Sequence, residues 1–345
     1  MTQIKNNSRN ESVDAFRLFA AFFVIVIHLE YPNIPRDVVV AARLVSRWAV
    51  PFFFIISGYF LALKREKNKS LDVQATIERL AWIFLVWIVI YFPLEIHDDN
   101  LNASKLLDLL TTPMFIFAGN YYHLWFIPSL LFGYLFVSIC YNYNAKYLLP
   151  VMSLISLAIA LFAGGYRLFA LNFNLSFIIP RFWLCIPFLY IGFLIYQKGR
   201  PSWQVSAFLA VFGAALQFFE GKLIYAYFGI SAYKIQFTAG TVIFAYGMAC
   251  LALSDLKFLQ HPLLSKWGRD YSLGIYLIHP LINFIVGGLA YMLVPVVAMN
   301  KVWQAALPIT VLFLSLAALI AMNRYKPAVF NFLLGIRAPS QSDRR

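Results

Sequence analysis

Ten apolar runs of roughly 15 to 20 residues follow one another along this chain, and they constrain its fold more than any other feature. A transmembrane helix needs about 20 mostly apolar residues, because lipid offers no partners to the backbone N–H and C=O groups. Of the 345 residues, 61% are hydrophobic and 12% are charged, far from the balance of a soluble domain. We therefore predict an all-α, polytopic membrane helix bundle of about ten transmembrane helices. The predicted ranges are 15–31, 48–63, 80–94, 123–141, 148–163, 182–197, 204–219, 235–253, 272–292 and 304–322.

The basic residues between these runs predict the orientation. With the N-terminus in the cytoplasm, 19 of the 28 Lys and Arg fall on the cytoplasmic side, as the positive-inside rule requires. The basic stretch 64–69 is the clearest cytoplasmic anchor, and the acidic loop at 95–122 fits the outer side. An even number of helices places both termini in the cytoplasm. The predicted organisation is an N-terminal tail (1–14), a transmembrane domain (15–322) and a C-terminal tail (323–345).

The charge and the cysteines exclude several classes of function. The net charge of +13 comes from residues that flank apolar runs, so it indicates contact with membrane lipids and not with nucleic acid. Cys140, Cys185 and Cys250 all lie inside apolar runs without CxxC spacing, which indicates packing and not a zinc or disulfide site. The sequence contains no phosphate-binding loop, dinucleotide fingerprint, HExxH or GxSxG motif. We expect no metal and no bound cofactor.

Arg17 and His28 stand eleven residues apart on the first predicted helix. Eleven residues make three turns plus about 20°, so both side chains project from one face, about 16 Å apart along the axis. A guanidinium can hold a phosphate or polarise a carbonyl, and an imidazole can take a proton from a hydroxyl near neutral pH. The alternative is a snorkelling arginine and a histidine that only packs. Because buried ionisable groups are costly without a purpose, a functional pair is the favoured interpretation.

The ninth range places Ser272, Tyr276 and His279 on one helix face, at i, i+4 and i+7. A polar face in a lipid environment should point into the bundle. Pro280 follows directly and cannot donate a backbone hydrogen bond, so it leaves a carbonyl free nearby.

His123 and Trp125 open the fourth range from the outer side. Aromatic residues are expected at this membrane interface as a belt, and sugars also stack on such rings. When Trp125 is considered by itself, the interfacial belt is the favoured interpretation. His28, His123 and His279 come from different helices at different estimated depths. Metal binding needs three or four converging ligands, so these histidines are not expected to form a metal site.

Two further segments carry polar side chains near helices. In the second range, Pro51 kinks or starts the helix, and Ser57 with Gly58 lets another helix approach closely, which by itself is ordinary membrane packing. Directly before the third predicted range, Arg79 follows Glu78. Arg79 is either a topology anchor or a ligand for an anionic group at the inner surface.

Four motifs, in order, carry a resemblance to a known family: Asp14-Ala15-Phe16-Arg17 through His28, Val50 to Phe60, His123-Leu124-Trp125-Phe126, and Ser272 to Pro280. Over residues 10–322 the chain resembles the acyltransferase-3 family of bacterial integral membrane acyltransferases. Within the family it resembles the stand-alone branch that includes the O-acetyltransferase of enterobacterial common antigen. One departure lies at the third helix, where many members have two arginines and this chain has Arg79 after Ile77 and Glu78.

The resemblance implies an O-acyltransferase, and O-acetyl transfer in particular, in the bacterial cytoplasmic (inner) membrane. Acetyl-CoA or another acyl-CoA would be the donor, and a cell-surface glycan or lipid-linked sugar the acceptor. His28 is the expected general base or transient acyl carrier, and Arg17 the residue that positions the donor. The other expected site residues are Arg79, Ser57, Tyr276 and His279 for the donor and His123 and Trp125 for the acceptor. A transporter or flippase for a glycan or lipid-linked sugar is the alternative.

Overall fold

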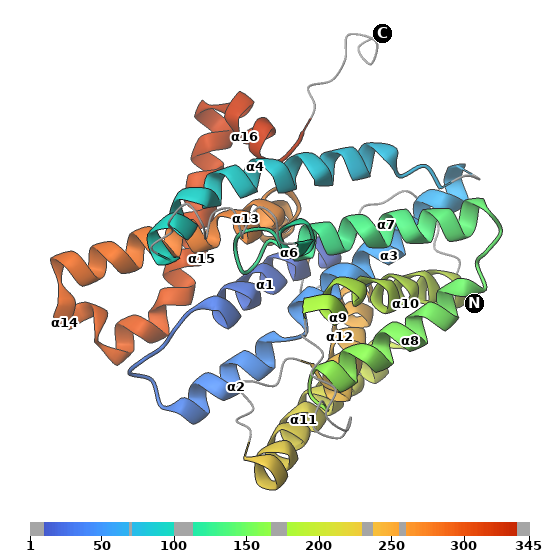
Figure 1. The fold of residues 1–345 in the computed structure, drawn as a ribbon, viewed down its shortest axis with the longest axis horizontal. Helices are drawn as coiled ribbons and strands as arrows, with labels where there is room; N and C mark the ends of the chain where they lie inside the picture. The colour runs from blue at the N-terminus through green and yellow to red at the C-terminus, as the bar shows by residue number, and fades with distance from the viewer. Residues whose placement is uncertain are drawn as a thin grey trace.

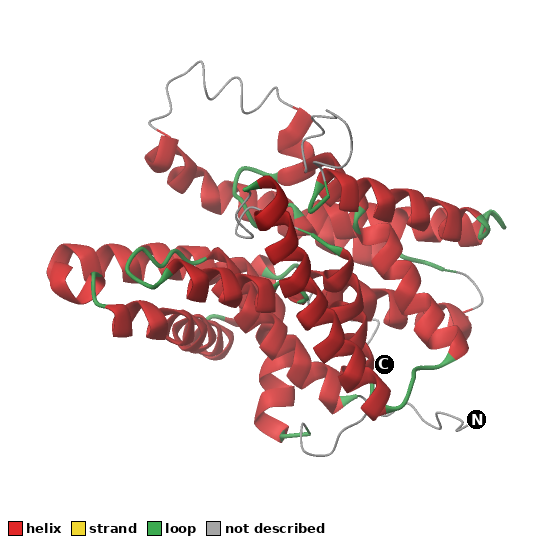
Figure 2. Ribbon diagram, turned by 90° about the horizontal axis from the view of Figure 1, so that it is seen from below, coloured by secondary structure: helices red, strands yellow, loops and turns green. Residues whose placement is uncertain are grey.

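The computed structural model describes residues 10–68, 71–99, 113–166, 178–229, 237–254 and 260–336 (Figure 1). Within these ranges all regular secondary structure is helical, which confirms the predicted all-α class (Figure 2). The helices are α1 (Glu11–His28), α2 (Arg36–Ser46), α3 (Ala49–Asn68), α4 (Gln74–Asp99), α6 (Pro113–Ala118), α7 (Phe126–Asn142), α8 (Leu148–Ala163), α9 (Ile178–Trp183), α10 (Cys185–Lys198), α11 (Trp203–Phe228), α12 (Ala239–Ala252), α13 (Pro262–Leu293), α14 (Pro295–Ala298), α15 (Lys301–Tyr325) and α16 (Pro327–Leu333).

Each of the ten predicted ranges coincides with one of these helices: α1, α3, α4, α7, α8, α10, α11, α12, α13 and α15. By length and composition, five helical segments of the described chain can cross a membrane: Arg36–Glu66, Gln74–Leu94, Trp203–Phe228, Pro262–Leu293 and Lys301–Tyr325. Three shorter helices, α7, α8 and α12, are also apolar. The sidedness stays a prediction. Residues 1–9, Lys69 of the basic stretch, residues 100–112 of the acidic loop and residues 337–345 lie outside the described residues.

Helix α2 falls where an outer loop was expected. This helix is amphipathic: Val39 and Leu44 are buried, whereas Arg36 is exposed. Arg36, Asp37 and Arg43 interrupt its apolar residues, which explains why the apolar pattern did not reveal it. A short bend separates it from α3, whose Pro51 lies in the first turn, so that proline starts the helix.

Helices α1 and α13 run side by side through the middle of the molecule (Figure 1). Gly268 permits this, because a Cβ there would collide with the carbonyl of Asp14. The Ser265 hydroxyl also donates to the Glu11 carbonyl, at 2.9 Å. The two helices start at the same end and run in the same direction, so His28 and His279 reach the same level.

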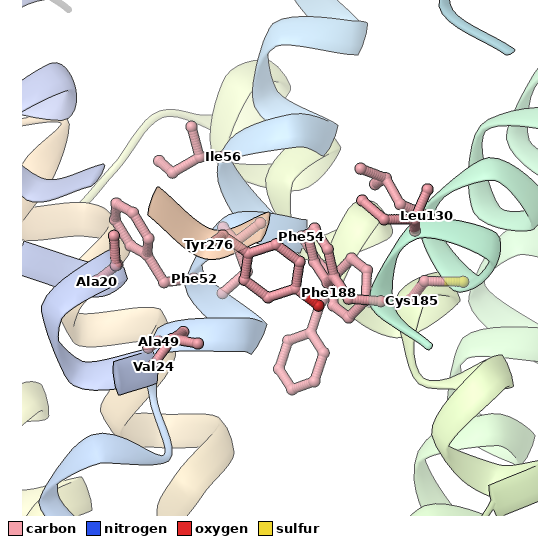
Figure 3. Packing of buried hydrophobic residues seen from close by; sticks show 14 of the residues in the cluster. Ala20, Val24, Ala49, Phe52, Phe54, Ile56, Leu130, Cys185, Phe188 and Tyr276 are labelled. Carbon is pink, nitrogen blue, oxygen red and sulfur yellow. The ribbon is translucent and has the colours of Figure 1, made fainter. Parts of the chain in front are cut away.

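Helices α3 and α10 interlock through two glycines. A Cβ on Gly58 would collide with the backbone of Leu189, and a Cβ on Gly192 would collide with the carbonyl of Ile55. This confirms the predicted close helix approach at Gly58. The core beside it holds the rings of Phe52 and Phe54 from α3, Phe188 from α10 and Tyr276 from α13 (Figure 3).

Candidate functional site

Three histidines from distant parts of the chain meet at one end of α1. The ring of His279 lies 5.7 Å from that of His28 and 5.4 Å from that of His123, measured between centroids. The expectation that the three lie at different depths is therefore wrong. His123 belongs to the turn that precedes α7, so the rise of a helix does not set its depth. We call His28, His123 and His279 the histidine cluster.

Pro280 fixes the ring of His279. Proline has no N–H to offer the carbonyl four residues before it, which is that of Tyr276. His279 Nδ1 lies 2.7 Å from this oxygen. A carbonyl only accepts, so Nδ1 carries the proton and donates it, which leaves Nε2 as an acceptor. The carbonyl that Pro280 was expected to free therefore sets both the orientation and the tautomer of His279.

Tyr276 positions the second histidine. Its hydroxyl donates to the carbonyl of His123 and ties the turn before α7 to α13. Tyr91, from α4, donates its hydroxyl to the carbonyl of Leu277 at 2.6 Å, and its ring lies 4.9 Å from that of His123. Ser272, Tyr276 and His279 are all buried, so the polar face predicted for α13 does point into the bundle.

His28 is the accessible member of the histidine cluster. The side chains of His123 and His279 are 0% exposed, whereas His28 is partly exposed. Both ring nitrogens of His123 and Nε2 of His279 make no hydrogen bond to the described residues. Buried polar atoms are usually satisfied, so these nitrogens mark a place where a further polar group belongs. Tyr122 adds a ring 4.8 Å from that of His28.

Arg17 lies at the other end of α1, in a different environment. Its Nη1 donates to Oδ1 of Asp14 at 3.0 Å, and its guanidinium carbon lies 5.2 Å from the ring centroid of Phe60. The Tyr134 hydroxyl on α7 lies near both Arg17 and Ser57. Arg17 thus lies near Phe60 of α3 and Tyr134 of α7, and His28 lies near the turn that leads into α7. The two side chains stand about 16 Å apart along α1.

The structure does not bring Arg79 to this cluster. Its Nε donates to the carbonyl of Leu334 at 3.0 Å, in the chain after α16. It stands twelve residues before Tyr91 on α4, about 18 Å along the axis. A pocket of about 410 Å³ opens at the same end of α4. Its lining includes Gln74 and Glu78 from α4 and Ser138 and Asn142 from α7.

Arg43 and Arg181 lie near His28, and Arg47 lies near both of them, although the sequence pattern singled out none of the three. Arg181 on α9 lies over the ring of Trp125, at 5.1 Å from its centroid. Arg43 on α2 donates to the carbonyl of Leu29, directly after His28, at 3.1 Å. Arg47 follows α2. All three were counted only as outer-side cations, because nothing in their local sequence marks them. In the part of the chain that is described, no group of three or more His, Cys, Asp or Glu is arranged to hold a metal ion.

The apolar helices, which are long enough to span a bilayer, define a multi-pass membrane protein. Its interior carries buried ionisable side chains, which usually mark a functional site in a membrane protein. Comparison with family models gives the class more closely, because the acyltransferase domain of the acyltransferase-3 family matches residues 10–322. The chain belongs to this family and is a membrane acyltransferase. The four motifs that suggested the family all lie inside the matched region.

Curated relatives match a smaller part of the chain. An amino-acid racemase of Enterococcus faecalis is 36% identical over 137 residues, which cover 38% of this chain and 19% of that protein. A serine/alanine racemase of Enterococcus gallinarum is 29% identical over 137 residues, which again cover 38% of this chain and 19% of that protein. The chain thus spans about a fifth of the length of these relatives, and the activity in their names is not carried over. No solved structure matches the chain.

Proposed function

We propose that this protein transfers an acyl group, an acetyl group in particular, from cytoplasmic acyl-CoA to a hydroxyl of a cell-surface glycan or lipid-linked sugar. The observation that carries the proposal is the histidine cluster, in which His28 alone is accessible and two buried imidazoles support it. The family membership supports acyl transfer, and the inner membrane of a bacterium is the proposed location.

His28 acts as the general base. The acceptor hydroxyl gives its proton to the imidazole while its oxygen attacks the thioester carbonyl. The C–O bond forms, the C–S bond breaks, and the departing CoA thiolate takes the proton back from the imidazolium. General-base help of this kind contributes about 10²–10⁴ in rate. In the second route within the same class, His28 itself carries the acyl group between donor and acceptor.

Arg17 positions the donor at the opposite end of α1. Its guanidinium holds a CoA phosphate or orients the arm that carries the thioester, and Asp14 fixes the guanidinium through their ion pair. The pantetheine arm of CoA is a long extended chain, which suits a path of about 16 Å from Arg17 to His28. The pocket that Glu78 and Asn142 help to line opens at the end of α4 that carries Arg79, which supports a cytoplasmic entry for the donor there.

The test is release of free CoA thiol by the purified full-length protein. Acetyl-CoA is incubated with the protein, with and without a glycan extract of the source membrane, and the thiol is titrated with a chromogenic disulfide. The proposal predicts thiol release that depends on the extract, together with an acetyl-labelled product. Uptake of the glycan into proteoliposomes without any acetyl transfer would overturn the proposal in favour of the transporter.

A further inference from the structure

A stack of tyrosine rings leads from the core of the bundle to the accessible histidine. The rings of Tyr91 and Tyr121 are nearly parallel, with centroids 4.6 Å apart and an interplanar angle of 15°. The ring of Tyr122 lies 4.7 Å from that of Tyr121 and 4.8 Å from that of His28. We call Tyr91, Tyr121 and Tyr122 the tyrosine stack. Its last ring therefore stands directly beside the imidazole that is proposed to activate the acceptor.

Exposure in this part of the chain is confined to that last ring. Tyr122 is 46% exposed, whereas Tyr91 and His123 are fully buried. Within residues 119–125, the turn that leads into α7, every other residue is buried or half-buried. Tyr122 thus presents a surface of ring carbon atoms next to His28, the one accessible member of the histidine cluster.

Hydrogen bonds on both sides of Tyr122 hold the turn in place. The side-chain amide of Asn120 donates to the carbonyl of Ile88 on α4, at 3.0 Å. The carbonyl of His123 accepts from the hydroxyl of Tyr276 on α13. Because the residues before and after it are anchored to two helices, the exposed ring has a fixed place before any ligand arrives. A surface that is already ordered costs little conformational entropy on binding.

The chemistry of this surface suits a sugar ring. The face of an aromatic ring is negatively polarised, so it attracts the positively polarised C–H bonds on one face of a pyranose. Tyrosine combines a large apolar area with a rigid side chain, which suits it to such contacts. A pyranose that lies on Tyr122 has its rim hydroxyls beside the neighbouring ring, and that neighbour is His28.

Trp125, the ring that was expected at the acceptor site, is less available. The guanidinium carbon of Arg181 lies 5.1 Å from its centroid, and the ring of Phe54 lies 6.5 Å from it. Its side chain is only partly exposed. Part of the surface of Trp125 is thus already in contact with the protein, whereas almost half of Tyr122 is exposed.

We infer that Tyr122 is the platform on which the sugar ring of the acceptor stacks, with a rim hydroxyl directed at His28. This inference rests on the proposed function and names the form in which the substrate is recognised. That form is a pyranose with an apolar C–H face next to the hydroxyl that is acylated, whether the sugar is free or linked to a lipid. An open-chain polyol carries similar hydroxyls without such a face, so it should not bind.

Saturation-transfer NMR with the purified full-length protein tests the inference without catalysis. The protein is held in lipid nanodiscs free of sugar detergents. The probes are the methyl pyranosides of glucose, galactose, mannose and N-acetylglucosamine, with mannitol as the open-chain control. At least one pyranoside should receive saturation, strongest at the C–H protons of one ring face, and mannitol should not. Equal saturation of mannitol, or saturation of no pyranoside, overturns the inference.

Variants then locate the site, once each is shown to unfold at the wild-type temperature. Tyr122→Leu keeps an apolar side chain without the aromatic face and should weaken pyranoside binding about tenfold. Tyr122→Phe keeps the ring and should bind nearly as well as wild type. Tyr147→Ala is the control, because this tyrosine is 67% exposed at the start of α8, beyond the other end of α7. If Tyr122→Leu binds as well as this control, or if Tyr122→Phe loses as much as Tyr122→Leu, the ring is not the platform.

The kinetics of thiol release separate this inference from the proposed function. Tyr122→Leu should raise the KM for the acceptor about tenfold and leave the KM for acetyl-CoA unchanged. His28→Ala should lose thiol release and still bind the pyranoside. If the wild-type protein binds pyranosides through Tyr122 but transfers no acyl group, the proposed function fails and the sugar site stands. If Tyr122→Leu lowers kcat while pyranoside binding and the acceptor KM stay at the wild-type level, the ring acts on His28 itself, and the sugar platform is wrong.

Discussion

Asp14→Asn tests the ion pair that holds Arg17. The Nη1–Oδ1 distance is 3.0 Å, and the side chains of Arg17 and Asp14 are 28% and 6% exposed. At an effective dielectric of about 20, two unit charges at this distance attract by about 5 kcal/mol, and desolvation of the carboxylate offsets most of that gain. Because Arg17 keeps some contact with solvent, we expect a net loss of about 1–3 kcal/mol in the free energy of unfolding.

The same substitution should raise the KM for acyl-CoA about tenfold and change kcat much less, because the guanidinium loses its orientation but not its charge. Stability is measured by thermal unfolding in detergent with a thiol-reactive dye, since Cys140, Cys185 and Cys250 are free and buried in the folded state. KM is measured by thiol release over a range of donor concentrations.

Asp270→Asn is the matched control. It removes the same charge from an ion pair with Arg269, where both side chains are about a third exposed. Exposed pairs contribute less than about 1 kcal/mol, so stability and KM should barely change. If Asp14→Asn behaves like this control in both measurements, the ion pair does not position Arg17.

Three further substitutions probe the scaffold and the site. Tyr276→Phe leaves the buried carbonyl of His123 without its hydrogen-bond donor, so the free energy of unfolding should fall by about 1–2 kcal/mol. The kcat should also fall while KM stays unchanged. A loss of stability alone would make Tyr276 purely structural. Gly58→Val should abolish folding, because its Cβ meets the backbone of α10, whereas Gly287→Val on α13 has open space and should fold normally. Arg17→Lys should lower kcat/KM at least tenfold, because a point charge replaces a planar fork, and normal turnover would reduce Arg17 to a topology residue.

The apolar pattern predicts the helices well, because the bilayer requires long apolar runs and each one coincides with a helix. The face of α13 was also predictable, since Ser272, Tyr276 and His279 follow helical spacing. The narrower resemblance to the branch with the enterobacterial common antigen O-acetyltransferase stays a prediction, as do the roles of the individual site residues.

The meeting of the three histidines could not be predicted. Helical rise gives the depth of His28 and His279 along their own axes, but the close approach at Gly268 decides that these axes lie in register. His123 stands in a turn whose place depends on Tyr276 and Tyr91, both distant in sequence. Arg43, Arg47 and Arg181 were missed for the same reason, because they share no local motif and come from separate places, α2, the turn after it and α9.

Acyl transfer by His28→Ala shows whether the His28 imidazole activates the acceptor hydroxyl. The control is His261→Ala, an exposed histidine at the start of α13, and both variants are first shown to unfold at the wild-type temperature. We expect His28→Ala to lose about 10²–10⁴ in kcat/KM and His261→Ala to transfer normally. Equal transfer by the two variants would contradict the assignment of His28 as the group that activates the acceptor.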